Sequence, residues 1–195
     1  MISTLALSSL LLLAQAPGSG WAMVNAPPRD VRRLYWELAE TTEVWVRLTP
    51  GDPNGAAPLL SLVFQAFFPG RAARDPYTAL PQWPKGEPAR LVVRAEPFVL
   101  TAIRDLTLWL VLDDYTFDLT SPGSRHSILG CGPAGSDNCA PNIVEAELHP
   151  TLLRALIAAR TIGGEAFGFP IQLTAADQRA LAEFAGRVGV APTHR

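Results

Sequence analysis

The side chains of this chain that could perform hydrolysis gather between residues 113 and 149. A hydrolytic site needs a nucleophile, a general base and a carboxylate that orients the base. The candidates are Ser124 and Ser127 as nucleophile, His126 and His149 as base, and Asp113, Asp114 and Asp118 as carboxylate. A domain of this size carries several such residues without a site, and no G-x-S-x-G or H-E-x-x-H motif supports them. A hydrolase is therefore the alternative hypothesis.

The same aspartates could also bind calcium if the chain bends around them. An acidic pair between two apolar runs is more typical of a solvated hairpin tip. Residues 130–135 have the G-x-G-x-x-G spacing of a dinucleotide-binding turn, but a proline lies inside this segment and no helical pattern follows. We expect no metal and no cofactor.

Cys131 and Cys139 are the two cysteines of the chain. In an oxidising compartment they would pair, closing a small loop that contributes about 2.6 kcal/mol in the loop-entropy model. Two thiolate metal ligands or one reactive thiol are the alternatives. Both lack a C-x-x-C motif or a second cysteine pair.

Tryptophan and arginine recur at alternate positions of several apolar runs, which predicts a mixed sheet face. The residues at these positions are Trp45, Arg47, Gln65, Arg90, Arg94, Thr107 and Trp109. If their strands are neighbours, the face could bind a sugar, an acidic peptide or a partner protein by stacking and charge-assisted hydrogen bonds. The alternative is structural, with arginine stems covering tryptophan in cross-strand pairs.

Residues 69–88 contain five prolines and form the one long loop that the sequence predicts. Tyr77 and Trp83 lie in this loop and could form a binding tip. Trp83 could equally pin the loop to the body of the domain.

Apolar residues recur with a period of two from residue 34 to residue 119, which predicts β-strands. The expected strands are Leu34–Ala39, Glu43–Thr49, Leu59–Phe68, Ala89–Ala95, Leu106–Asp113, 115–119 and Asn142–Leu148. Val31, Leu34, Tyr35 and Leu38 also fit a helical stripe, so the first strand is ambiguous. The turn signal Asp52-Pro53-Asn54-Gly55 predicts that the second and third strands form a hairpin or an inter-sheet connection.

The last part of the chain, 150–189, predicts a helix, a strand and a helix. Pro150 can open the first helix, which we expect to stop at Gly163–Gly164. A strand Glu165–Leu173 follows, and Thr174 with Asp177 predicts a capping box for a second helix ending before Gly189. The predicted fold is mainly β (α+β), a β-sandwich or partly open β-barrel with a C-terminal helix-strand-helix unit.

Residues 1–22 contain no charged side chain and include the apolar run Leu5–Leu13, which predicts a signal peptide. A run of about a dozen residues is short for a membrane span, although a retained anchor and a buried first helix are the alternatives. Residues 23–195 then form a single globular domain, because 195 residues leave room for little more. We expect no membrane span in the mature form.

Composition and net charge argue against a disordered chain and against a nucleic-acid-binding protein. Hydrophobic residues make up 48% and the net charge is −2, with scattered arginines, so the chain should be globular and not bind nucleic acid. We therefore expect a bacterial, periplasmic or secreted binding domain without catalytic activity. Its partner would be a protein, a peptide or a glycan.

Overall fold

A computed structural model describes residues 29–51, 60–72, 82–97, 106–121, 125–129 and 143–190, and of residues 126–129 it describes the backbone alone. Ten strands and two helices lie in these ranges. In chain order they are β1 (Val31–Trp36), β2 (Thr41–Leu48), β3 (Leu60–Pro69), β4 (Arg90–Pro97), β5 (Leu108–Leu112), β6 (Tyr115–Asp118), β7 (His126–Leu129), β8 (Ile143–Glu147), α2 (Pro150–Ala158), β9 (Ile162–Ala166), β10 (Phe169–Gln172) and α3 (Ala175–Arg187). The predicted mainly β class is confirmed.

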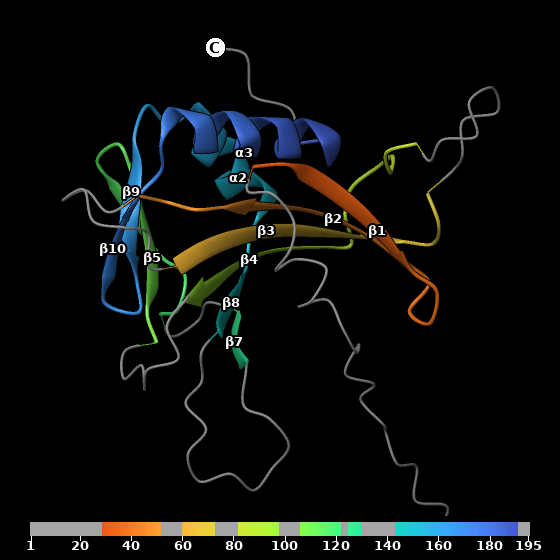
Figure 1. Cartoon of the computed structure of the whole chain (residues 1–195), viewed down its shortest axis with the longest axis horizontal. Coiled ribbons are helices and arrows are strands. Elements are labelled where there is room, and N and C mark those ends of the chain that lie inside the picture. The colour runs from red at the N-terminus through yellow and green to blue at the C-terminus, as the bar shows by residue number, and fades with distance from the viewer. Residues whose placement is uncertain are drawn as a thin grey trace, which may run out of the picture.

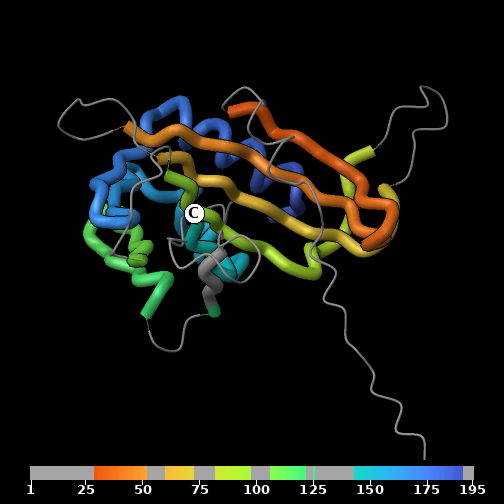
Figure 2. The backbone as a smooth tube through the Cα atoms, turned by 60° about the horizontal axis from the view of Figure 1, so that its bottom comes forward, coloured from red at the N-terminus to blue at the C-terminus, as the bar shows by residue number. Residues whose placement is uncertain are grey.

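The strands form two antiparallel sheets. Sheet A has the order β1-β2-β3-β4-β8-β7, and sheet B has the order β10-β9-β5-β6. Both helices lie over one face of sheet A, and sheet B stands at one end of it (Figure 1). The turned view shows β1 to β4 running side by side across the molecule, with α3 behind them (Figure 2). One isolated bridge, between Gly51 and Gln172, joins the two sheets.

Alternation along the strands of sheet A separates a core face from an outer face. Val44, Val46 and Leu48 of β2 are fully buried in the main hydrophobic cluster. Phe64 of β3 packs against Phe184 of α3, with ring centroids 6.5 Å apart. Because side chains of a strand point alternately to its two faces, the odd-numbered residues of β2 and β3 lie on the face away from the helices.

The ambiguous first segment is a strand. β1 pairs with β2 over its whole length, from Val31 opposite Val46 to Trp36 opposite Thr41. Pairing with β2 satisfies the backbone groups on one side of β1, and it favours the strand over the helix that the sequence also allows. β2 and β3 are adjacent and antiparallel, as their turn signal predicts.

The C-terminal unit differs from the prediction in two places. The helix α2 starts at Pro150 as expected but ends at Ala158, before Gly163–Gly164, which belong to β9. The expected single strand Glu165–Leu173 is a hairpin of β9 and β10. Its turn residues, Phe167 and Gly168, have φ angles of 59° and 77°, and this left-handed pair reverses the chain.

The start of α3 agrees with the predicted capping box. The Thr174 hydroxyl accepts a hydrogen bond from Asp177 N, and an Asp177 carboxylate oxygen accepts one from Thr174 N. Asp177 is fully buried and also accepts a hydrogen bond from Arg29 Nε at 2.8 Å. This contact ties the segment before β1 to the helix that covers it. No helix in the described ranges has the length and apolar character to span a bilayer.

Candidate functional site

Four of the predicted binding residues share the outer face of sheet A. Register places Arg47 opposite Val63, and Val63 opposite Arg94, so the two arginines lie on either side of Val63 in one row across three strands. Trp45 and Arg90 occupy other rows of the same face. The mixed face predicted from alternation therefore exists across β2, β3 and β4.

Two glutamates pair with the three predicted arginines of this face. Glu96 accepts hydrogen bonds from Arg47 Nη2 at 2.7 Å and from Arg94 Nη1 at 3.4 Å. Glu145 of β8 accepts from Arg94 Nη2 at 3.2 Å and from Arg90 Nη2 at 2.5 Å. The sequence pattern missed both carboxylates. Glu96 could have been found from the sequence, because it lies two positions after Arg94 on the same face of β4. Glu145 could not, because it belongs to β8, which is distant in sequence although it pairs with β4.

Burial limits what this face can offer to a ligand. Trp45 is 3% exposed and packs with Val63, and the Arg47 and Arg94 side chains are 11% and 13% exposed. Glu43, also buried, accepts hydrogen bonds from Trp36 Nε1 and Gln65 Nε2. The Arg47–Glu96–Arg94–Glu145 chain is thus a largely buried network that joins strands, and it ends at Arg90, whose side chain is 51% exposed.

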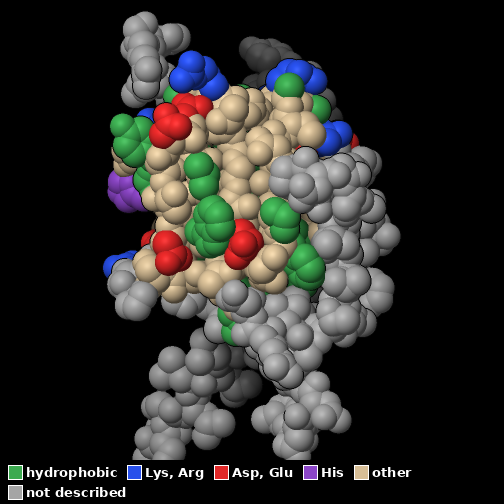
Figure 3. All heavy atoms as spheres, turned by 90° about the vertical axis from the view of Figure 1, so that its left-hand side faces the viewer, with side chains coloured by type: hydrophobic (Ala, Val, Ile, Leu, Met, Phe, Trp, Pro, Cys, Tyr) green, Lys and Arg blue, Asp and Glu red, His purple; other side chains and the backbone are tan. Residues whose placement is uncertain are grey.

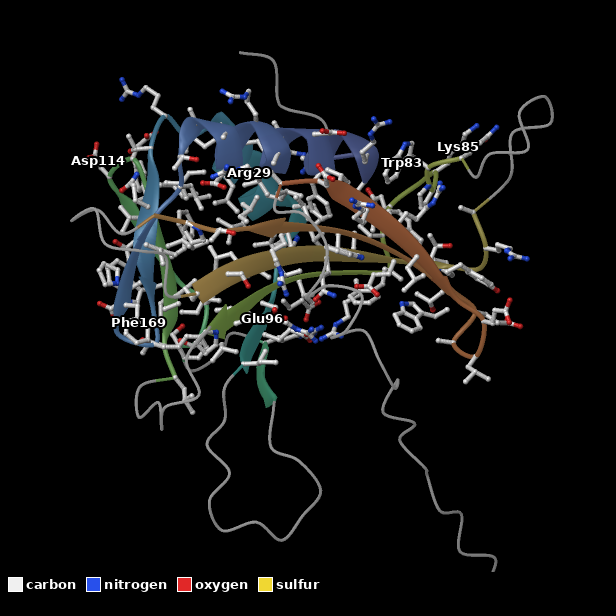
Figure 4. The ribbon with its side chains drawn as sticks, viewed as in Figure 1. Arg29, Trp83, Lys85, Glu96, Asp114 and Phe169 are labelled. Atoms are coloured by element: carbon white, nitrogen blue, oxygen red, sulfur yellow. The ribbon has the colours of Figure 1, made fainter. Side chains whose placement is uncertain are left out.

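A second candidate site surrounds Trp83, which lies at the end of sheet A that is farthest from sheet B (Figure 4). The guanidinium carbons of Arg33 and Arg187 lie 5.2 Å and 4.6 Å from its ring centroid. Arg33 Nη1 also donates a hydrogen bond to the Gln82 carbonyl oxygen. Burial lowers the pKa of Arg33, which stays charged because the group titrates far above neutral pH. Trp83 is therefore held against the body of the domain.

A hollow of about 290 Å³ lies beside Trp83, and we call it the Trp83 pocket. Its wall includes Thr42, Phe68, Arg71, Trp83, Lys85 and Glu87. Arg71 lies 5.0 Å from the Tyr35 ring centroid. Within the described part of the chain, neither Arg71 nor Lys85 forms an ion pair.

The other side of the same loop borders a more open hollow of about 460 Å³, next to Arg187 at the end of α3. Trp83 and Lys85 line both hollows. The fixed Trp83 ring thus lies beside two cations, Arg71 and Lys85. Neither of them has a carboxylate partner among the described residues. Such a surface can hold an anionic group beside an apolar one.

Trp109 lies in neither of these places. It belongs to β5 of sheet B, where it is opposite Asp118 of β6 and Glu165 of β9. The arginines of sheet A therefore do not interleave with Trp109. Thr107 precedes β5, and its backbone carbonyl accepts a hydrogen bond from Phe167 N at 3.0 Å.

Described members of the hydrolytic set have local structural roles. His149 caps α2, its Nδ1 accepting a hydrogen bond from Thr151 N. Asp113 accepts hydrogen bonds from the backbone of Arg160 and Thr161, just beyond the other end of α2. Since α2 has nine residues, about 13 Å of helix separates these two groups. Asp118 accepts a hydrogen bond from Thr120 N, and Asp114 is exposed.

The remaining predicted residues fall outside what the structure describes. Tyr77, Ser124, Cys131 and Cys139 lie in undescribed segments, so the disulfide stays a prediction. His126 and Ser127 belong to β7, but their side chains are not described. Within the described residues, no cluster of three or more histidine, cysteine, aspartate or glutamate side chains could hold a metal ion.

Comparison of the chain with protein-family models, with curated proteins and with solved structures finds no match.

Proposed function

We propose that this protein is an exported, non-catalytic binding domain whose Trp83 pocket receives an acidic peptide segment of a partner. One observation carries the proposal: Arg71 and Lys85 line a hollow beside a fixed tryptophan and have no carboxylate partner among the described residues. A glutamate or aspartate of the ligand would pair with these cations. An adjacent apolar side chain would contact Phe68 and Trp83.

Electrostatics supports an anion more than a cation at this pocket. Two positive groups and one negative group, Glu87, lie in its wall, and Arg33 and Arg187 add positive charge behind Trp83. Arg187 is partly balanced by Glu183, which accepts a hydrogen bond from it at 3.4 Å. The arginine–tryptophan contacts also fix the ring before a ligand arrives, which lowers the entropy cost of binding.

The test is a titration with a dye-labelled peptide of alternating glutamate and leucine, followed by fluorescence polarisation. The double variant Arg71→Gln/Lys85→Gln should weaken binding about tenfold, because two charge-assisted contacts are lost. Arg179→Gln is the matched control, since it removes an exposed positive charge from α3 about 12 Å away along the helix axis from Arg187. Equal binding of a glutamine-for-glutamate peptide, or equal loss in Arg179→Gln, would refute the pocket as the site.

Export is the second part of the proposal and is tested separately. The uncharged segment 1–22 with its Leu5–Leu13 run supports a cleaved signal peptide. Mass spectrometry of the protein recovered from a bacterial periplasmic fraction should give a mature N-terminus between residues 17 and 23. Recovery of the intact chain from the membrane fraction would instead mean that the segment is retained.

A further inference from the structure

The outer face of sheet B presents one row of side chains across all four of its strands. Register places Asp118, Trp109, Glu165 and Pro170 side by side on β6, β5, β9 and β10. Since neighbouring strands lie about 4.8 Å apart, the backbones that carry the two acids are about 10 Å apart, with the indole between them. Asp118 is exposed, and Trp109 and Glu165 are half-buried. Acidic groups beside apolar side chains are visible on this face (Figure 3).

The charges on this sheet are all of one sign. The sequences of β5, β6, β9 and β10 contain no lysine or arginine, and their two acidic residues, Asp118 and Glu165, both belong to the row. Two carboxylates this close raise the negative potential over the indole. A cation placed there gains from Glu165 and from the aromatic ring.

The next row on the same face has small residues at its two central positions. The neighbouring row contains Thr116, Val111, Gly163 and Gln172. Gly163 has no side chain, and a Cβ there would lie 3.2 Å from Gln172 Oε1. A ligand side chain above Trp109 can therefore continue over Val111, whereas the space over Gly163 is already bordered by the Gln172 side chain.

We infer that this face binds a basic side chain of an extended peptide segment from a partner protein. An arginine fits best, because its planar guanidinium can lie over the indole while its N–H groups donate to Glu165. Asp118, whose Oδ1 already accepts hydrogen bonds from Thr120, adds negative charge on the other side of the ring. An anionic ligand would be repelled, and a neutral sugar would gain nothing from the two charges. The site is independent of the Trp83 pocket, which has the opposite charge and lies at the other end of the molecule (Figure 4).

The test is calorimetric titration of the full chain with a short peptide of alternating glycine and arginine, with a citrulline-for-arginine peptide as the neutral probe. The variants Glu165→Gln and Trp109→Phe should each weaken binding of the arginine peptide about fivefold. Asp114→Asn is the matched control, because it removes an exposed negative charge of the β5–β6 turn that lies outside the row, and it should bind like the wild type. Thermal melting of each variant checks that the fold is retained.

Three outcomes would overturn the inference. The first is that the wild type binds the arginine and citrulline peptides with equal affinity. The second is that Asp114→Asn loses as much affinity as Glu165→Gln. The third is that the protein binds a neutral oligosaccharide through Trp109, as shown by loss of binding in Trp109→Phe, and does not bind the arginine peptide. Glu165→Gln should leave binding of the acidic glutamate–leucine peptide unchanged. The two sites can thus fail or succeed separately.

Discussion

The backbones of Gly164 and Trp109 approach so closely that a Cβ on Gly164 would lie 2.2 Å from the Trp109 carbonyl oxygen. Gly164 also has a φ angle of 150°, which favours glycine. This approach holds β9 beside β5 and sets Glu165 opposite Trp109. The glycine is therefore part of the geometry that forms the acidic row of sheet B.

Replacement of Gly164 by alanine should destabilise the domain by about 3 kcal/mol or more, because both the φ angle and the backbone contact oppose a side chain. Urea denaturation followed by circular dichroism measures the change. Gly186→Ala is a control of opposite sign, since this glycine lies in α3 and a Cβ there would meet nothing within 4 Å. That control should raise stability by about 0.5–1 kcal/mol. Equal effects of the two substitutions would contradict the close approach.

Replacement of Asp177 by alanine should cost about 1–2 kcal/mol. The substitution removes the capping box of α3 and the ion pair with Arg29 together. Arg29→Gln removes the ion pair and leaves the cap, so it should cost about 0.5 kcal/mol, since the arginine side chain is 41% exposed. Chemical denaturation of both variants separates the two contributions. A larger loss in Arg29→Gln than in Asp177→Ala would contradict this, and would show that the buried carboxylate without its cation costs more than the loss of both contacts.

The strands could be predicted because alternation is a local signal. Val44, Val46 and Leu48 are close in sequence and point to the same buried side, so a short window suffices to find β2. Gly163 and Gly164 could not be interpreted in that way. They resemble a helix stop in sequence, and only the approach of β5 explains why glycine occupies a strand there.

The composition of each face depends on pairings between distant strands, which the sequence pattern does not contain. Arg94 meets Glu145, 51 positions away, and this carboxylate joins the predicted face into a cross-strand network that is largely buried at Arg94. Trp109 alternates in its strand just as Trp45 does, yet it lies in the other sheet between two acids. Local spacing tells which face of a strand a side chain occupies. Only the register between strands tells which other side chains lie next to it.

The Arg47–Glu96–Arg94 contact predicts a stability loss that a surface pair would not show. Glu96→Gln should destabilise the domain by about 3 kcal/mol, because it removes the negative charge that pairs with two largely buried guanidinium groups. Among the described residues, Arg47 Nε and Arg94 Nε already have no hydrogen-bond partner. Glu147→Gln is the matched control, since Glu147 pairs with the exposed Arg125 and should change stability by less than about 0.5 kcal/mol. Denaturation midpoints of the two variants give the comparison. Similar losses would mean that the network is solvated.

Asp113 predicts a pH dependence of stability. Hydrogen bonds from Thr161 N first, and then from Arg160 N and the Thr161 hydroxyl, lower the pKa of this carboxyl below its usual 3.8. A carboxyl with a depressed folded-state pKa stabilises the domain fully above its unfolded-state pKa, and this contribution is lost as the pH falls through the folded-state pKa. Asp113→Asn removes the charge that these donors stabilise, although its amide oxygen can still accept one or two of the bonds.

Wild type and Asp113→Asn should therefore differ most in stability near neutral pH, and the difference should shrink between about pH 5 and pH 2. Urea midpoints at a series of pH values measure it. Asp114→Asn is the control, because the hydrogen bonds from residues 160 and 161 go to Asp113 and not to its exposed neighbour, so the difference of this variant from wild type should stay small throughout. A difference between wild type and Asp113→Asn that stays constant over this range would show that the amide replaces the carboxylate fully, and that the charge of Asp113 does not hold the β5–β6 turn to the end of α2.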